Sequence, residues 1–169
     1  MNELLLQYAS YNAWANKKLL HRVCLLPEEQ IQQEIVSSFS SIYKTVLHLL
    51  DAESIWWQRL RLAEQIIIPS QHFTGTSIEL INETLRQSTQ WEQWVTTASD
   101  NQLQHVFAYQ NSKKEQFKQP VNEVLVHIFN HGTFHRGQIV TILRQLGVDN
   151  IPQTDFIHFN NSFRYNRTT

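Results

Sequence analysis

Four stretches of the chain repeat apolar residues every three or four positions, which is the spacing of one face of a helix. They run from residue 3 to about 24, from the serines at 37–41 to about 62, from 77 to about 98, and from 120 to about 146. A chain of 169 residues is the size of one domain with one core. The pattern therefore predicts an all-α protein in which residues 1–169 form a single helical bundle.

The ends of these stretches carry residues that favour helix termini. Ser37–Ser41 supply N-cap candidates for the second helix, and Thr76 or Ser77 for the third. Pro120 suits the first position of the fourth helix. Gly147 suits the position just after its end, where the backbone turns left-handed. These residues are expected to bound the predicted helices.

The segments between the helices show other patterns. Residues 103–119 alternate apolar and polar positions around a polar turn, which predicts a short β-hairpin between the third and fourth helices. Pro27–Glu29 is expected to be a loop, and residues 64–76 a connection. The tail, 149–169, has three open interpretations: a lid, an extended arm packed on the bundle, or a partly disordered end.

The fourth stretch contains two histidines four residues apart, His131 and His135. This spacing puts both imidazoles on the same face of a helix, one turn apart, where they can share a metal ion. Both lie in an apolar stripe, where unpartnered imidazoles would cost several kcal/mol. Gly132 and Gly137 each cost about 1 kcal/mol relative to Ala in a helix. We expect each glycine to allow another helix or a ligand to approach closely.

Two ligands are too few for a protein metal site, and His48 on the second helix is the best third. It lies at a core-facing position beside small residues. His127, one turn before His131, is expected to support the site or pack in the core, because three successive turns drift too far to reach one ion. His72 and His105 fall outside the helical stripes and are predicted to be on the surface. His158 lies in the tail and could approach the mouth of the site.

Composition narrows the possible functions. The net charge is -1 with 17% charged residues, so no basic excess predicts nucleic-acid binding. The single cysteine, Cys24, excludes an internal disulfide and a thiolate zinc site. We see no signal peptide and no apolar run near the ~20 residues that a membrane span needs. The expected location is therefore the cytoplasm.

Three histidines without cysteine or carboxylate are typical of a catalytic metal with an open coordination position. The metalloprotease motif needs a glutamate after the first histidine, and Gly132 stands there instead. A structural ion or a metal-free bundle are the alternatives. Asp51 and Glu53 are weak candidates for a general base, with Glu53 on a different face from His48. Asn12 is a buried amide or a donor that supports the site, and Asn12 and Arg136 could orient a substrate.

Three segments resemble the motifs of the DinB family of YfiT-like metalloenzymes. They are, in order, Tyr11–Asn16, His48–Trp56 and His127–Gln138. The resemblance covers nearly the whole chain. It implies an up-down-down-up four-helix bundle with a divalent metal held by His48, His131 and His135. The metal expected first is Zn or Ni, with Mn or Fe as alternatives.

The resemblance also implies a function. Some relatives are thiol-dependent S-transferases or isomerases that use bacillithiol, mycothiol or glutathione, and members often pair as homodimers. We therefore expect a metal-dependent enzyme, either hydrolase-like or a thiol-dependent S-transferase, acting on a small molecule. A non-catalytic metal-binding stress-response protein is the alternative, and neither a nucleic acid nor a membrane is an expected partner. Many relatives have a second histidine where this chain has Phe134, so its pocket rim is expected to be more apolar.

Overall fold

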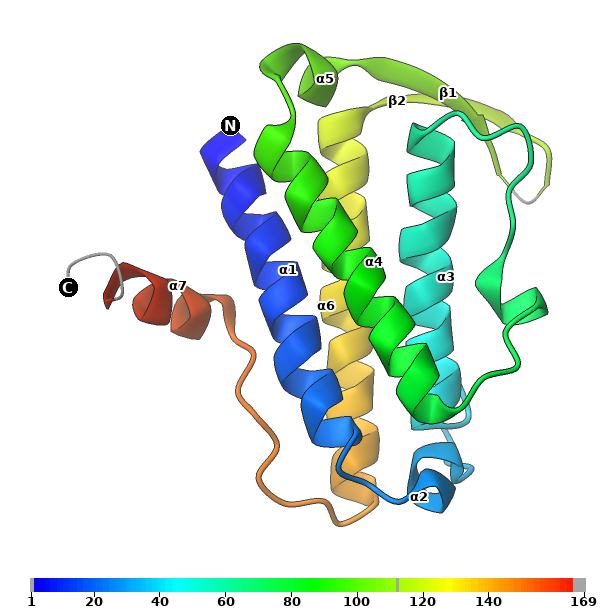
Figure 1. Cartoon of the computed structure of the whole chain (residues 1–169), viewed down its shortest axis with the longest axis vertical. Coiled ribbons are helices and arrows are strands. Elements are labelled where there is room, and N and C mark those ends of the chain that lie inside the picture. Colours follow the sequence, from blue (N-terminus) through cyan, green and yellow to red (C-terminus); the bar gives the residue numbers. More distant parts are fainter. Residues whose placement is uncertain (1, 112, 166–169) are drawn as a thin grey trace.

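The structure is a computed structural model that describes residues 2–111 and 113–165. Four long helices lie side by side in it (Figure 1). Their bounds are α1 Asn2–Val23, α3 Ile42–Leu60, α4 Ser77–Thr97 and α6 Val121–Gln145. Helices α1 and α6 run in one direction, and α3 and α4 in the other. The prediction of an all-α, up-down-down-up four-helix bundle is confirmed.

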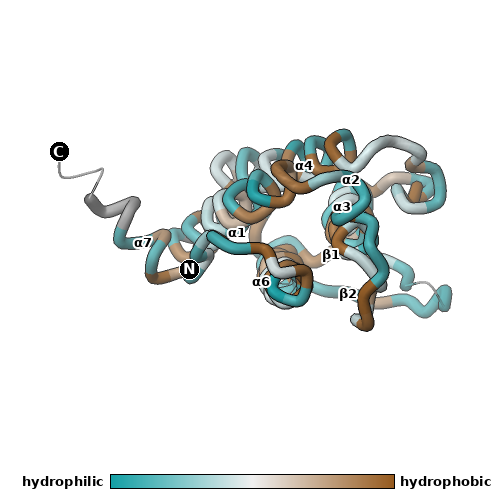
Figure 2. Tube along the Cα trace, turned by 90° about the horizontal axis from the view of Figure 1, so that it is seen from below, coloured by the Kyte–Doolittle hydropathy of each residue, from teal (hydrophilic) through white to brown (hydrophobic). Residues whose placement is uncertain are grey.

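The four helices surround a common centre. Helix α1 contacts α4 and α6, and α3 contacts the same two helices from the opposite side. Figure 2, a view along the bundle, shows this arrangement, with α7 outside it. No helix in the described part of the chain is both long enough and apolar enough to span a membrane.

The predicted helix ends are close to the observed ones. The Ser41 side chain accepts a hydrogen bond from the Lys44 backbone N–H (3.1 Å) and so caps α3. Thr76 caps α4 in a reciprocal capping box with Glu79. Gly147 follows α6 with a φ of 70°, as predicted for a residue in the left-handed region.

Three short helices connect or follow the long ones. Helix α2 covers Glu28–Gln32, so the loop prediction there was wrong; Ile31 is buried in the core and fixes this turn. A 3-10 turn, η1, covers Pro69–Gln71 within the predicted connection. Helix α5 covers Asp100–Gln104, where the strand prediction began too early.

The predicted β-hairpin is confirmed and lies over one end of the bundle (Figure 1). Strands β1 (Val106–Gln110) and β2 (Gln116–Pro120) pair antiparallel, with the first residue of β1 opposite the last of β2. Because Pro120 belongs to β2 and caps α6, the helix begins one residue later than predicted.

The tail forms a helix, α7 (Phe156–Tyr165), and residues 166–169 lie outside the described part. Phe156 and Phe159 place their rings 5.1 and 5.9 Å from that of Tyr11 in α1. The Tyr11 hydroxyl donates a hydrogen bond to the Thr154 carbonyl (2.8 Å). The interpretation as an arm packed on the bundle is therefore correct, and that of a lid is not.

A buried polar layer lies within the apolar core of the bundle. Glu53 of α3 is 2% exposed and accepts hydrogen bonds from Asn12 (2.9 Å), Ser88 (2.9 Å) and Asn16 (3.3 Å). The Arg136 Nη1 donates to the Asn12 and Asn16 side-chain oxygens, both at 2.8 Å. The layer joins all four long helices through one guanidinium, two amides, a hydroxyl and a carboxyl group.

This layer decides two predictions about polar residues. Asn12 is a buried amide bonded within the bundle, which was one of its two interpretations. Arg136 is 2% exposed, so the prediction that Arg136 and Asn12 could orient a substrate was wrong. Burial raises the pKa of the Glu53 carboxyl, and the hydrogen bonds that its oxygens accept and the charge of Arg136 oppose that rise.

The two helical glycines of α6 have different surroundings. A Cβ at Gly132 would lie 2.7 Å from the Asn12 Oδ1 and 3.0 Å from the Arg136 Nη1. A Cβ at Gly137 would meet nothing within 4 Å. The predicted close approach is therefore confirmed at Gly132, where the Asn12–Arg136 hydrogen bond passes over the helix. No helix approaches Gly137, where the approach of a ligand stays a prediction.

Candidate metal centre

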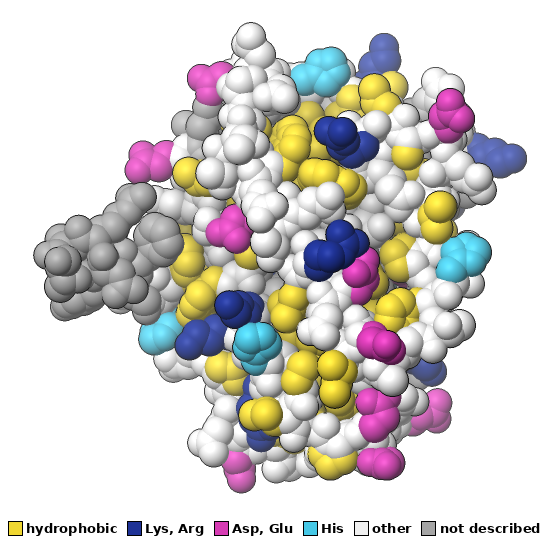
Figure 3. Space-filling view, viewed as in Figure 1, with side chains coloured by type: hydrophobic (Ala, Val, Ile, Leu, Met, Phe, Trp, Pro, Cys, Tyr) yellow, Lys and Arg dark blue, Asp and Glu magenta, His cyan; other side chains and the backbone are white. Residues whose placement is uncertain are grey.

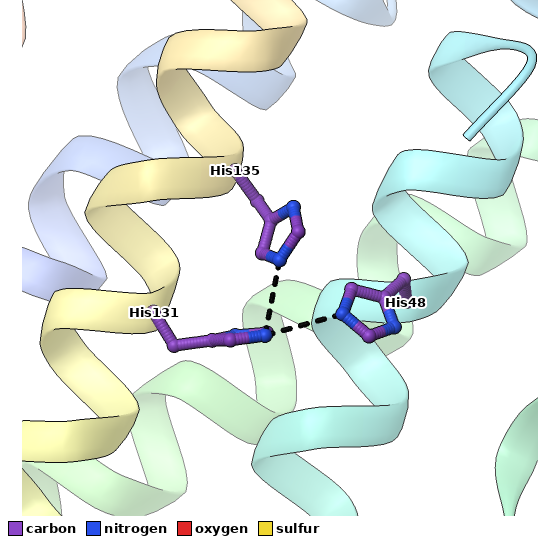
Figure 4. A group of neighbouring side chains, drawn as sticks. All are labelled: His48, His131 and His135. Atoms are coloured by element: carbon purple, nitrogen blue, oxygen red, sulfur yellow. Dashed lines mark hydrogen bonds between the residues drawn. The ribbon is translucent and has the colours of Figure 1, made fainter. Parts of the chain in front are cut away.

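Helices α3 and α6 bring three imidazoles together (Figure 4). The His131 Nε2 lies 3.1 Å from the His48 Nε2 and 3.0 Å from the His135 Nε2. One nitrogen of each ring lies within 4.8 Å of the others. The structure thus collects the three histidines that the sequence singled out, and only these among the described residues form such a group.

The spacing of these nitrogens suits one small cation. Two histidine nitrogens bound to the same tetrahedral zinc, at about 2.0–2.1 Å each, are about 3.3 Å apart. The two short separations, 3.0 and 3.1 Å, need only slight widening to reach that value. Three ligands from the protein would leave one position of a tetrahedron open.

Hydrogen bonds alone cannot satisfy this arrangement. A neutral imidazole nitrogen carries either one hydrogen or one lone pair. The His131 Nε2 faces two rings, so it can form a good hydrogen bond with only one of them. A cation between the rings would instead accept a lone pair from all three.

Gln138 sets the tautomer of His135. The His135 Nδ1 lies 2.7 Å from the Gln138 Oε1, an acceptor, so the nitrogen carries the proton and donates. The Nε2 of a neutral ring then presents its lone pair to the other histidines. The Gln138 amide donates in turn to the Ser38 hydroxyl (3.1 Å), which fixes its orientation. Sequence reasoning missed this role, although the i, i+3 spacing of His135 and Gln138 was available.

The three rings are held neutral. Burial lowers the pKa of His131 to about 4, and the charges of His135, His48 and His127 act in the same direction. Burial and the charge of His135 lower the pKa of His48, which Asp51 raises less. Burial lowers the pKa of His135 against the opposing hydrogen bond to Gln138. Neutral imidazoles are the form that binds metal.

Two phenylalanines border the cluster. The Phe39 ring stacks on His48 with centroids 4.2 Å apart, and its edge faces His135 at 5.6 Å. Phe134 is 62% exposed, with its ring centroid 5.0 Å from that of His135. The prediction of an apolar rim at Phe134 fits this position. Phe39 lies in the serine-rich segment before α3, and no helical pattern connected it to the site.

Sequence comparison now decides the family, because the DinB family profile matches residues 1–167. The chain belongs to the DinB family. It is 32% identical to the protein DinB of Bacillus subtilis (strain 168) over 166 residues, which covers 92% of this chain and 93% of that protein. The family assignment made from the three motifs is confirmed.

Solved structures share the fold of this chain at lower sequence identity. A DinB-like protein from Bacillus cereus ATCC 10987 aligns with a TM-score of 0.69 and 19% identity, covering 89% of this chain and 95% of that one. YfiT from Bacillus subtilis aligns with a TM-score of 0.68 and 16% identity, covering 88% and 91%. YfiT is described as a probable metal-dependent hydrolase with an unusual four-helix bundle topology.

Four other histidines stand apart from the cluster. His127 is exposed, with its ring centroid 6.0 Å from that of His131, so the prediction of a core position was wrong. His72 and His105 are exposed, as predicted. His158 packs on Trp14 of α1 (6.1 Å between centroids) and not at the site mouth, because α7 lies against α1.

The two carboxylates considered as general bases are engaged elsewhere. The Asp51 Oδ1 accepts a hydrogen bond from the Ser70 backbone N–H (2.8 Å) and so holds the η1 turn. Glu53 belongs to the buried polar layer. The chemistry of the site therefore depends on the imidazoles and on what they bind.

Proposed function

We propose that this member of the DinB family is a metal-dependent enzyme in which His48, His131 and His135 hold one divalent ion. The observation that carries the proposal is the convergence of three Nε2 atoms from two helices. The Nε2 of His131 lies 3.0 Å from that of His135 and 3.1 Å from that of His48. The description of YfiT as a metal-dependent hydrolase supports the same reading. Zn and Ni are the first candidates, because imidazole suits both.

The surrounding residues prepare the imidazoles for this role. Gln138 keeps the proton of His135 on Nδ1, which leaves the Nε2 lone pair free. Phe39 and Phe134 place apolar rings beside the imidazoles. A divalent ion held here would act as a Lewis acid toward a bound water, thiol or carbonyl group.

The reaction that we propose is hydrolysis of a small substrate or transfer of a low-molecular-weight thiol. Both need one open position beside three neutral ligands, which this donor set provides. The cytoplasmic location remains a prediction from the sequence, and the homodimer a prediction from the family resemblance. Sedimentation velocity on the purified protein tests the dimer.

The experiment is a turnover screen with the Zn- or Ni-loaded protein. Simple esters and amides form one panel, and low-molecular-weight thiols with electrophiles form the other. We expect turnover that is lost in His48→Ala and retained in His72→Ala, an exposed histidine away from the cluster. Equal turnover in both variants would overturn the proposed site. Metal binding without turnover in either panel would favour a non-catalytic metal-binding protein.

A further inference from the structure

A half-buried arginine, Arg59, packs against two aromatic rings near the end of α3. Its guanidinium carbon lies 4.6 Å from the ring centroid of Trp56 and 5.0 Å from that of Tyr109. Its Nη2 donates to the Gln110 carbonyl (3.0 Å). Its Nε is buried without a hydrogen-bond partner, and Arg59 forms no ion pair within the described residues. The cation is thus positioned but not neutralised.

Arg59 lies in line with the candidate metal centre. It follows His48 by eleven residues, which is three turns of the same helix, so both side chains leave the same face. At 1.5 Å per residue the two positions are about 16 Å apart.

Two aromatic rings, those of Trp56 and His127, link Arg59 to the candidate metal centre. The Trp56 ring centroid lies 5.4 Å from that of His127, which lies 6.0 Å from that of His131. A continuous row of rings therefore leads from the guanidinium to a metal ligand.

Open space adjoins the guanidinium. A hollow of about 420 Å³ between the end of α3 and the hairpin is lined by Arg59, Tyr109 and Gln110, among others. Glu64 also lines it, and it is an exposed residue. A small anionic group fits the size and the charge of this space next to Arg59.

An arginine in the last turn of a helix also interacts favourably with the helix dipole. That role needs neither the two aromatic partners nor the alignment with His48. A guanidinium packed against aromatic rings keeps its donors pre-organised for a planar, two-oxygen acceptor. The arrangement is that of a carboxylate anchor.

We propose that Arg59, with Trp56 and Tyr109, binds the carboxylate end of an elongated small-molecule substrate whose reacting end lies at the three-histidine centre. This inference rests on the proposed function. It assigns the substrate to carboxylate-bearing molecules that extend on the order of 15 Å from the reacting group.

Linear thiols loaded onto the Co²⁺-substituted protein test the inference. A thiolate that binds Co²⁺ gives a charge-transfer absorption band, which serves as the binding signal. The probes are ω-mercaptooctanoate, which spans the distance, the matched ω-mercaptooctanol, and the short pair mercaptopropionate and mercaptopropanol. Each is titrated into the wild type, Arg59→Gln and the control Arg61→Gln, an exposed arginine two residues further on.

We expect the wild type and Arg61→Gln to bind the long carboxylate about tenfold more tightly than the long alcohol, as for one charge-assisted pair. Arg59→Gln should lose this preference but bind the alcohol as before, which also shows that the variant is folded. The short pair should show no preference for the carboxylate in any of the three proteins.

Two results would overturn the proposal in different ways. A thiolate band with no preference for the long carboxylate, or one that survives in Arg59→Gln, would remove the anchor and leave the metal centre standing. No Co²⁺ band with any thiol would overturn the proposed open metal site together with the anchor.

Discussion

Replacing Gly132 with alanine tests how the polar layer is packed against α6. The added Cβ would lie 2.7 Å from the Asn12 Oδ1, which the network holds in place, and 3.0 Å from the Arg136 Nη1. It would separate the 2.8 Å hydrogen bond between these two atoms. Gly137→Ala, five residues later in the same helix, is the matched control, because its Cβ meets nothing within 4 Å.

The expected free energies differ in sign. Alanine gains about 1 kcal/mol over glycine in a helix interior. Loss of a buried hydrogen bond to a charged group costs about 1.5–3 kcal/mol, and displacement of the Asn12 amide also disturbs its bond to Glu53. We therefore expect Gly132→Ala to destabilise the protein by about 1–2 kcal/mol and Gly137→Ala to stabilise it by up to about 1 kcal/mol.

The assay is urea and thermal unfolding followed by circular dichroism, with a chelator present so that metal binding does not contribute to stability. For a domain of this size each kcal/mol corresponds to roughly 2–4 °C in Tm. The two variants should therefore move Tm in opposite directions. Equal stabilisation by both substitutions would show that the Asn12–Arg136 contact over Gly132 does not constrain the helix.

Three further predictions concern the site and the layer beneath it. Gln138→Ala should weaken Zn²⁺ binding about 10–100-fold in a chelator competition, since His135 loses the acceptor that fixes its tautomer; unchanged affinity would refute this role. The pKa of His131 is lowered from 6.5 to about 4, so the unfolded chain binds a proton on this ring at a higher pH than the folded chain does. The free energy of unfolding of the metal-free protein, measured by urea titration, should therefore fall as the pH drops from 6.5 to about 4, and this group should not change it above pH 6.5. Arg136→Met should lower the free energy of unfolding by about 3–5 kcal/mol. The double variant Arg136→Met, Glu53→Leu should lose less than the sum of the losses in the two single variants; additive losses would show that the two charges are not coupled.

The long helices were readable from sequence because each buries one continuous stripe. The start of α4 followed from Thr76 and Glu79, whose capping box is a local pattern. The same pattern at Ser99 and Gln102 begins α5, and it was overlooked because the apolar alternation that follows suggested a strand. Local signals therefore identified the long helices, and the capping box at Ser99 could have identified α5 as well.

The site was partly readable for the same reason. His131 and His135 share a helix, and their spacing alone places them together. Which residues meet across helices depends on how the helices are rotated and offset in the bundle. For this reason the sequence could not show that Phe39 stacks on His48, or that Arg136 points into the core.

The glycines show the same limit. Gly132 and Gly137 have the same intrinsic cost in a helix, and the sequence pattern does not distinguish them. Only the packing of α1 against α6 distinguishes them, because Asn12 reaches the backbone at one glycine and no side chain reaches the other.

Metal stoichiometry tests the central claim most directly. Purified protein is incubated with Zn²⁺ or Ni²⁺, passed through a desalting column and analysed for bound metal by elemental analysis. We predict close to one ion per chain in the wild type and in His127→Ala, the neighbouring histidine outside the cluster, and none in His131→Ala. A wild type without metal, or a His131→Ala variant that retains its ion, would contradict the three-histidine centre.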